Sequence, residues 1–138
     1  MIPQREPFVL VDTLESVTAT AFTSTFMVPD AHVLVADGQL SEAGLMENVA
    51  QTAALGIGWQ ARTAGAPAPL GFIGSIDRVM IHDLPPTGTL LTTTVLVKHQ
   101  VANVHVIEGS IRCAERIFAT MEMKVVMVDE STTPSTQG

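Results

Sequence analysis

The chain has 138 residues, of which 46% are hydrophobic and 15% are charged, and its formal net charge is −7. This length suits one domain, and the composition supports a buried core and excludes a disordered chain. The seven basic residues are scattered, whereas a nucleic-acid or anionic-membrane surface needs them clustered. We therefore expect neither a nucleic acid nor a membrane as a partner.

The cysteine content and the N-terminal sequence indicate a cytoplasmic protein. Cys113 is the single cysteine, so an intrachain disulfide is excluded, which suits a reducing compartment. The N-terminal sequence MIPQREPFVLVD lacks the basic and apolar regions of a signal peptide. No uncharged apolar stretch reaches the roughly 18 residues that a membrane span requires. The histidines, the cysteine and the acidic residues form no metal-binding motif, and we expect no metal.

Residues 13–28 are rich in Thr, Val and Phe, a composition typical of strands, and they predict one long strand or a bent pair. Residues 29–40 form a connector that contains Pro29 and the turn signal Asp37-Gly38. A helix is expected to begin near Ser41, a suitable N-cap, and to end between Thr63 and Pro69.

The predicted helix carries a polar pair in an apolar sequence, GLMENVAQTAALGIGW. Glu47 and Gln51 are four residues apart, so they share one helix face with the small residues Gly44, Ala54 and Gly58. Such a face invites the close approach of a ligand or a backbone. A solvent-facing edge, or a polar pair satisfied at a subunit interface, fits equally well, and the sequence leaves both open.

The chain after Leu70 is predicted to be sheet, in four long strands over residues 71–82, 89–100, 104–113 and 116–128. In the last of these, the alternation places Ile117 on one face with Ala119, Met121, Met123, Val125 and Met127, and Phe118 on the other. Strands joined by short turns predict an antiparallel meander. The result is an α+β domain over residues 1–128, with one helix against the sheet and a flexible polar tail over 129–138.

His32 is the histidine with the best case for a role, since it lies in the connector fifteen positions before Glu47. The connector could fold back over the start of the helix. An exposed loop imidazole between two aspartates is the competing interpretation. The other three histidines lie in or beside predicted strands, where most histidines are surface or core residues without a catalytic role.

Three stretches resemble, in order, the β-hydroxyacyl-[acyl carrier protein] dehydratases of the hotdog fold. They are PQREPFVLVD, MENVAQTAA and GFIGSIDRVMIHDLPPTGTLL, and the resemblance covers nearly the whole chain. It implies a long central helix wrapped by a mainly antiparallel sheet, and a homodimer or larger assembly with acyl-thioester tunnels at the subunit interface. Glu47 matches the family's catalytic acid and Gln51 its companion glutamine. The family's catalytic histidine falls on Val33, one place from His32, so the histidine loop is altered here.

The resemblance implies dehydration of a 3-hydroxyacyl thioester, on acyl carrier protein or CoA, in fatty-acid or polyketide-type metabolism. His32 would remove the α-proton and Glu47 would donate a proton to the departing hydroxyl. No cofactor is needed for this reaction. Besides Gln51, the residues expected to bind the substrate are the helix start (Ala43, Gly44 and Leu45), for the thioester oxygen, and Phe72 and Ile73, for the acyl chain.

Two alternatives remain open. The same tunnel could hold an acyl or polyketide chain without chemistry, in a binding or partner subunit that has lost the catalytic histidine. A hotdog acyl thioesterase is the other, because those enzymes also use a carboxylate on this helix.

Overall fold

The computed structural model describes residues 9–67 and 69–128, which form one helix, α1 (Glu42–Thr63), and eight strands. The strands are β1 (Thr13–Val17), β2 (Ala21–Met27), β3 (Val35–Ala36), β4 (Gln39–Leu40), β5 (Leu70–Ile81), β6 (Leu90–Val101), β7 (Val104–Cys113) and β8 (Arg116–Val128). Residues 13–28 are thus the bent pair, since β1 and β2 form an antiparallel hairpin.

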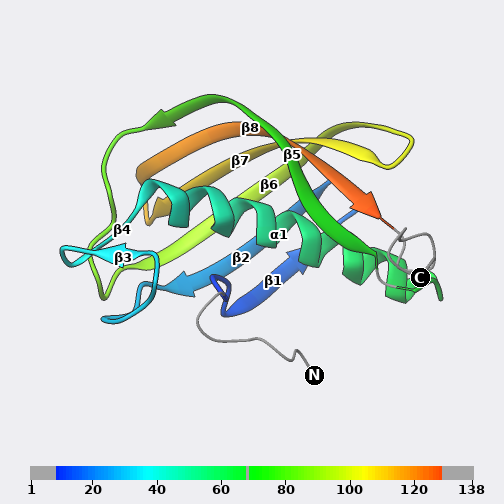
Figure 1. Cartoon of the computed structure of the whole chain (residues 1–138). Helices are drawn as coiled ribbons and strands as arrows, with labels where there is room; N and C mark the ends of the chain where they lie inside the picture. Colours follow the sequence, from blue (N-terminus) through cyan, green and yellow to red (C-terminus); the bar gives the residue numbers. More distant parts are fainter. Residues whose placement is uncertain (1–8, 68, 129–138) are drawn as a thin grey trace, which may run out of the picture.

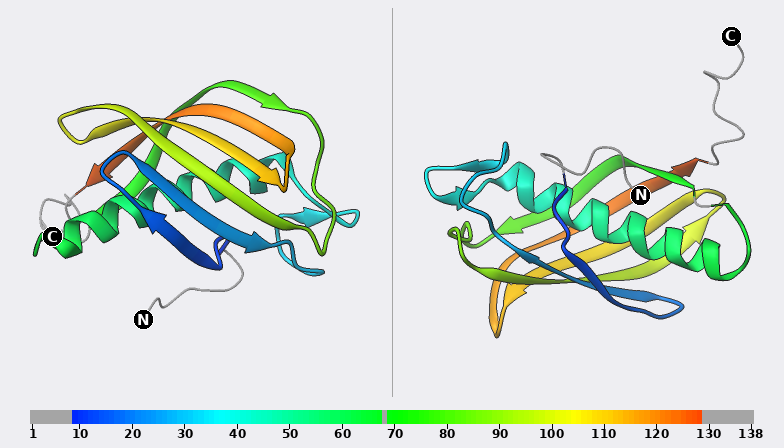
Figure 2. Two further views of the ribbon diagram at one scale, coloured as in Figure 1. Left: turned by 180° about the vertical axis from the view of Figure 1, so that it is seen from behind. Right: turned by 90° about the horizontal axis from the view of Figure 1, so that it is seen from below.

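Six strands form one antiparallel sheet in the order β1-β2-β6-β7-β8-β5, and α1 lies along its concave face (Figure 1). The predicted meander is correct for β6, β7 and β8. It is wrong for β5, which pairs with β8 at the far edge of the sheet, while β6 pairs with β2. The two further views show the sheet curving around the helix (Figure 2). The expected α+β architecture, one long helix wrapped by an antiparallel sheet, is confirmed.

Helix α1 begins and ends where the sequence predicts. The Ser41 hydroxyl accepts a hydrogen bond from the Gly44 N–H over 3.2 Å and caps the N-terminus. Beyond Thr63, Gly65 takes a positive φ of 79°, a conformation that glycine adopts without strain. The helix packs closely on the sheet at two glycines: Gly56 faces the Phe22 ring, and Gly109 of β7 faces Val49.

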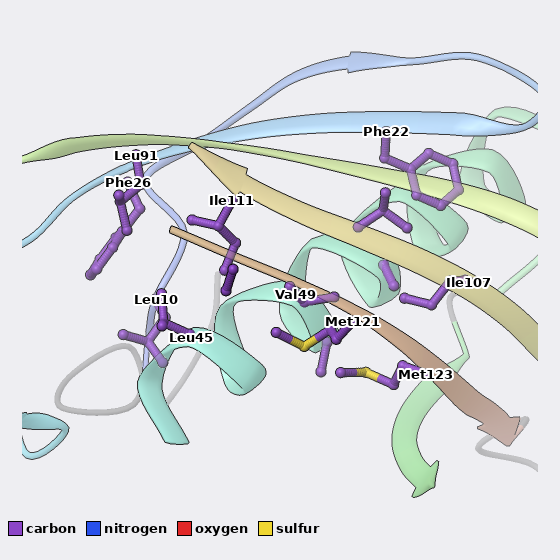
Figure 3. Close-up of a cluster of buried hydrophobic side chains, with 14 of the residues drawn as sticks. Leu10, Phe22, Phe26, Leu45, Val49, Leu91, Ile107, Ile111, Met121 and Met123 are labelled. Atoms are coloured by element: carbon purple, nitrogen blue, oxygen red, sulfur yellow. The ribbon is translucent and has the colours of Figure 1, made fainter. Parts of the chain in front are cut away.

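The core lies between α1 and the inner face of the sheet, and Figure 3 shows its main side chains. Those labelled there are Leu10, Phe22, Phe26, Leu45, Val49, Leu91, Ile107, Ile111, Met121 and Met123. Each has an exposed fraction of 4% or less. Burying a side chain of this size contributes roughly 1.5–3 kcal/mol. Because Leu10 belongs to this core, the chain just before β1 is anchored against the helix at this residue.

The start of β8 departs from the predicted alternation. Phe118 is 2% exposed and Ile117 is 45% exposed, the reverse of the expected faces. The register explains the exchange, because Ile111 pairs with Ala119 while Arg112 pairs with Ile117, which leaves Phe118 as an extra residue in a β-bulge. From Ala119 onward, the residues predicted to share one face do so, and all of them are buried.

The connector before the helix contains a small hairpin of β3 and β4. Its two turn residues, Asp37 and Gly38, both have positive φ, 55° and 73°, as the Asp-Gly signal predicts. The connector also carries His32. The predicted flexible tail over 129–138 and the beginning of the N-terminal segment lie outside the described residues. Within the described part of the chain, no helix is long and apolar enough to cross a membrane.

Candidate active site

A pocket of about 270 Å³ opens between helix α1 and the edge strand β5. Its walls carry one ionisable group, one amide and otherwise apolar or small residues. The lining residues are Glu47, Ala50, Gln51, Ala54, Gly71, Phe72, Ile73 and Val125. Helix α1 provides the polar wall, and β5 and β8 provide the apolar one, where Ile73 and Val125 are cross-strand partners.

Glu47 and Gln51 are hydrogen-bonded to each other on the pocket wall. Gln51 Nε2 donates to Glu47 Oε2 over 3.3 Å, and Gln51 Oε1 accepts the backbone N–H of Leu10 over 2.8 Å. The two contacts fix the orientation of the Gln51 amide. A flipped amide would place its NH₂ group against the Leu10 N–H and its oxygen against the Glu47 carboxylate, so both hydrogen bonds would be lost. Gln51 therefore holds one carboxylate oxygen of Glu47.

Asn48, three residues before Gln51 on α1, also binds Leu10. Its Nδ2 donates to the carbonyl oxygen of Leu10 over 2.7 Å, and its Oδ1 accepts from the Thr93 hydroxyl of β6 over 2.5 Å. Asn48 and Thr93 are both buried, with exposed fractions of 0% and 1%. A buried polar pair with its hydrogen bonds made costs little and fixes the geometry. Leu10 is thus bound to α1 through both its N–H and its C=O.

His32 does not line the pocket. Its Nδ1 accepts the backbone N–H of Leu34 over 3.0 Å, and its Nε2 lies 3.2 Å from the carbonyl oxygen of Val9. Since the first contact needs a bare Nδ1 and the second needs a proton on Nε2, both contacts are satisfied by the neutral Nε2–H tautomer. Both ring nitrogens are therefore occupied by the backbone.

The amides at the helix start are largely used by the cap. The Gly44 N–H bonds to the Ser41 hydroxyl, and the Leu45 N–H bonds to the Ser41 carbonyl oxygen over 3.0 Å. Gly44 and Leu45 are buried, and Ala43 is exposed. None of the three lines the pocket.

The remaining histidines lie away from the pocket. His82 and His99 are exposed, whereas His105 of β7 is buried, with an exposed fraction of 8%. Burial lowers the pKa of His105 below its ordinary value of 6.5, because a charged imidazole loses its hydration there. Its Nδ1 has no hydrogen-bond partner among the described residues. Across residues 9–67 and 69–128, no group of three His, Cys, Asp or Glu side chains is placed to hold a metal ion.

The structure therefore brings four of the predicted site residues together: Glu47, Gln51, Phe72 and Ile73. It leaves His32 and the helix start outside the pocket. Sequence reasoning did not name the other four lining residues as site residues. Ala54 shares the helix face of Glu47 and Gln51, so its position was readable; Val125 depends on the strand register, which no local pattern supplies.

The model of the ApeP-like family, described as ApeP dehydratase, matches residues 1–135. The chain belongs to this family. No protein with curated annotation matches the sequence significantly.

Solved structures with the same fold include a dehydratase heterocomplex, an uncharacterised protein and a protein from an operon for phenylacetic acid degradation. The dehydratase heterocomplex ApeI:P from Xenorhabdus doucetiae is similar with a TM-score of 0.84 at 20% identity, covering 94% of this chain and 90% of that chain. The uncharacterised protein PH1136 from Pyrococcus horikoshii has a TM-score of 0.70 at 11% identity, covering 93% and 88%. The PaaI protein from the phenylacetic acid degradation operon of E. coli has a TM-score of 0.63 at 16% identity, covering 82% of this chain and 80% of that chain. At these identities the likeness establishes the hotdog fold.

The pocket has the chemistry of a proton-transfer site with an apolar extension. A carboxyl group held by an amide can give or take a proton at an oxygen of a bound ligand. The alanines of the helix wall leave room beside it, and Phe72 and Ile73 offer apolar contact to a chain. This member of the ApeP-like dehydratase family thus has a carboxylate and an amide in one pocket, with no imidazole among the lining residues.

Proposed function

We propose that the chain catalyses the reversible dehydration of a 3-hydroxyacyl thioester, carried on acyl carrier protein or CoA, in fatty-acid or polyketide-type metabolism. The observation that carries the proposal is Glu47, which lines an otherwise mostly apolar pocket and is oriented by Gln51. Membership in the ApeP-like dehydratase family supports the same reaction. A cytoplasmic location is part of this proposal.

In the reaction, the protonated Glu47 carboxyl donates its proton to the hydroxyl on C3, which leaves as water. A base removes the proton from C2, and the electron pair of that C–H bond forms the C2–C3 double bond of the enoyl thioester. Gln51 Nε2 holds the other carboxylate oxygen, so the proton is presented from a fixed position. The acyl chain extends past Ala54 toward Phe72 and Ile73.

The base is expected from outside the described pocket lining. The sequence predicted His32 for this task, but both of its nitrogens are hydrogen-bonded to backbone groups. The pocket is bounded on one side by the edge strand β5, where a second chain can reach it. The similar structure from Xenorhabdus doucetiae is a dehydratase heterocomplex, ApeI:P.

Strand β5 has the properties of an association surface. It lies at the edge of the sheet, and Leu70, Phe72 and Ile73 are 46%, 55% and 39% exposed. A long apolar edge strand with free backbone groups pairs readily with another strand. We infer that a second hotdog chain pairs with β5 and closes the pocket. The second chain is either another copy of this chain, as the sequence predicts, or a different hotdog chain, as in the heterocomplex. The assay below distinguishes the two.

The test is turnover of 3-hydroxyacyl and 2-enoyl thioesters of CoA and of acyl carrier protein. It compares the recombinant chain with the native assembly purified through a tag on this chain. We expect interconversion of the two thioesters, lowered about 10²- to 10⁴-fold by Glu47→Gln. If the recombinant chain is active by itself, both halves of the site belong to copies of this chain. If only the native assembly is active, one half belongs to another chain.

A control variant with the same chemical change is Glu108→Gln, because Glu108 is an exposed carboxylate of β7 outside the pocket. Hydrolysis of the thioester without interconversion would identify a thioesterase. Binding of the acyl chain with no turnover in either preparation would identify a binding subunit. Either result overturns the proposal.

A further inference from the structure

We infer that His32 is a positioning residue, which acts on the Glu47 carboxylate through the Val9–Leu10 peptide group and Gln51. This inference rests on the proposed function for Glu47. It assigns to His32 a task that differs from removal of the α-proton.

The contacts form one continuous chain of hydrogen bonds. The Leu34 N–H donates to His32 Nδ1, and His32 Nε2–H donates to the carbonyl oxygen of Val9. That carbonyl and the N–H of Leu10 belong to the same peptide group. The Leu10 N–H then donates to Gln51 Oε1, and Gln51 Nε2 donates to Glu47 Oε2.

The three inner groups, which are the His32 ring, the Val9–Leu10 peptide and the Gln51 amide, each accept on one side and donate on the other, in the same direction. Such an arrangement polarises each member, so that its hydrogen bonds strengthen one another. A peptide group whose oxygen accepts a hydrogen bond is a better N–H donor, and this draws the Gln51 amide into the orientation that Glu47 needs. The carboxylate is thereby connected to a loop residue fifteen positions before it.

The Val9–Leu10 peptide is fixed in space by further contacts, so it can transmit a position. The Leu10 side chain is fully buried, and the backbone carbonyl oxygen of Leu10 accepts a hydrogen bond from Asn48 Nδ2 over 2.7 Å. Asn48 is in turn held by Thr93 of the central strand β6. Two side chains of α1, Asn48 and Gln51, thus hold the two sides of Leu10, and His32 completes the set from the connector.

A base and a positioning residue make different demands on position 32. A base must take up a proton, which the amide of glutamine cannot do. A positioning residue must accept from Leu34 and donate to Val9, and the glutamine amide has one acceptor and one donor for these contacts. His32→Gln therefore separates the two tasks, with His32→Ala as the variant that removes both contacts.

The first measurement is kinetic, in the preparation where the wild-type protein is active. We expect His32→Ala to lower kcat about five- to tenfold, with KM little changed, because one of its two lost hydrogen bonds, the one to the Val9 carbonyl, leads toward Glu47. His32→Gln is expected to recover most of that loss. His99→Ala is the matched control, because His99 is exposed on β6 and touches none of these groups. Equal losses of a hundredfold or more in His32→Ala and His32→Gln would identify a base and overturn the inference.

The second measurement needs no substrate, and it separates failure of the inference from failure of the proposed function. In ¹H–¹⁵N spectra of the labelled wild-type chain, the His32 ring is expected as the Nε2–H tautomer. The side-chain amide signals of Gln51 and the carboxyl carbon of Glu47 are expected to shift in His32→Ala and to return in His32→Gln. The opposite tautomer in the wild type, or unchanged Gln51 and Glu47 signals in His32→Ala, would overturn the inference even if the wild type proves inactive.

Discussion

Leu10 donates its backbone N–H to Gln51 Oε1 over 2.8 Å, although 41 positions separate the two residues. In Gln51→Leu, this partly buried N–H loses its acceptor and Glu47 loses its amide donor. We expect the free energy of unfolding to fall by about 1–3 kcal/mol, the cost of an unsatisfied donor. Urea denaturation followed by circular dichroism measures the change.

Gln60→Leu is the matched control for that variant. Gln60 also lies on α1 and also bonds to the backbone, since its Nε2 donates to the carbonyl oxygens of Thr18 and Ala19. Those acceptors are exposed, so water replaces the amide, and the expected change stays within about 0.5 kcal/mol. Similar losses in the two variants would show that the Leu10 contact is not special to the fold.

Two glycines of α1 predict opposite effects of the same substitution. A Cβ at Gly56 would overlap the Phe22 ring, which is fully buried and cannot move away, so we expect Gly56→Ala to lower the free energy of unfolding by about 1–3 kcal/mol. A Cβ at Gly58 meets nothing within 4 Å, so Gly58→Ala is expected to raise it by up to about 1 kcal/mol, because alanine favours the helix. Thermal unfolding of both variants tests the pair, and a change of the same sign in both contradicts it.

Local signals in the sequence carried much of the fold. Ser41 and the Asp37-Gly38 pair mark a helix start and a tight turn through their own backbone chemistry, and the structure has both. The placement of β5 beside β8 and the bulge at Phe118 depend on which distant strands pair. No local pattern determines those pairings, so the predictions for β5 and Phe118 were wrong.

The candidate site divides in the same way. Glu47 and Gln51 share a helix face by their spacing alone, and the pocket contains both. The surroundings of His32 were not readable, because they depend on the meeting of the connector, residues 9–10 and the helix. From the sequence, His32 could be expected to lie near Glu47. Only the tertiary contacts show that the two ring nitrogens of His32 bond to Leu34 and Val9.

The buried His105 predicts a pH-dependent component of stability. Burial lowers its pKa in the folded protein, so below about its ordinary value of 6.5 the unfolded chain binds more protons than the folded one. The free energy of unfolding therefore falls as the pH drops from 6.5 toward the folded-state pKa, and the loss is complete below it. We expect His105→Leu to lack this component, so its stability relative to wild type rises between pH 7.5 and pH 5. Urea titrations across this range measure it. His99→Leu, at an exposed position, is expected to follow the wild type, and a constant difference for His105→Leu would contradict the assignment.

The exposed edge strand predicts how the chain associates. Phe72 lines the pocket, and its side chain, 55% exposed, lies on the outermost strand, whereas Leu96 is 44% exposed on the central strand β6. Without another partner we expect the 14.6 kDa chain to sediment as a dimer paired through β5. A charge at the centre of such an interface costs about 2 kcal/mol or more, so Phe72→Glu is expected to weaken the dimer at least about thirtyfold and to give monomers at micromolar concentration. Leu96→Glu, with a similar apolar side chain replaced, is expected to remain dimeric. A wild-type monomer would refute self-pairing, and dissociation by Leu96→Glu but not by Phe72→Glu would place the interface on the outer face of the sheet instead of on β5.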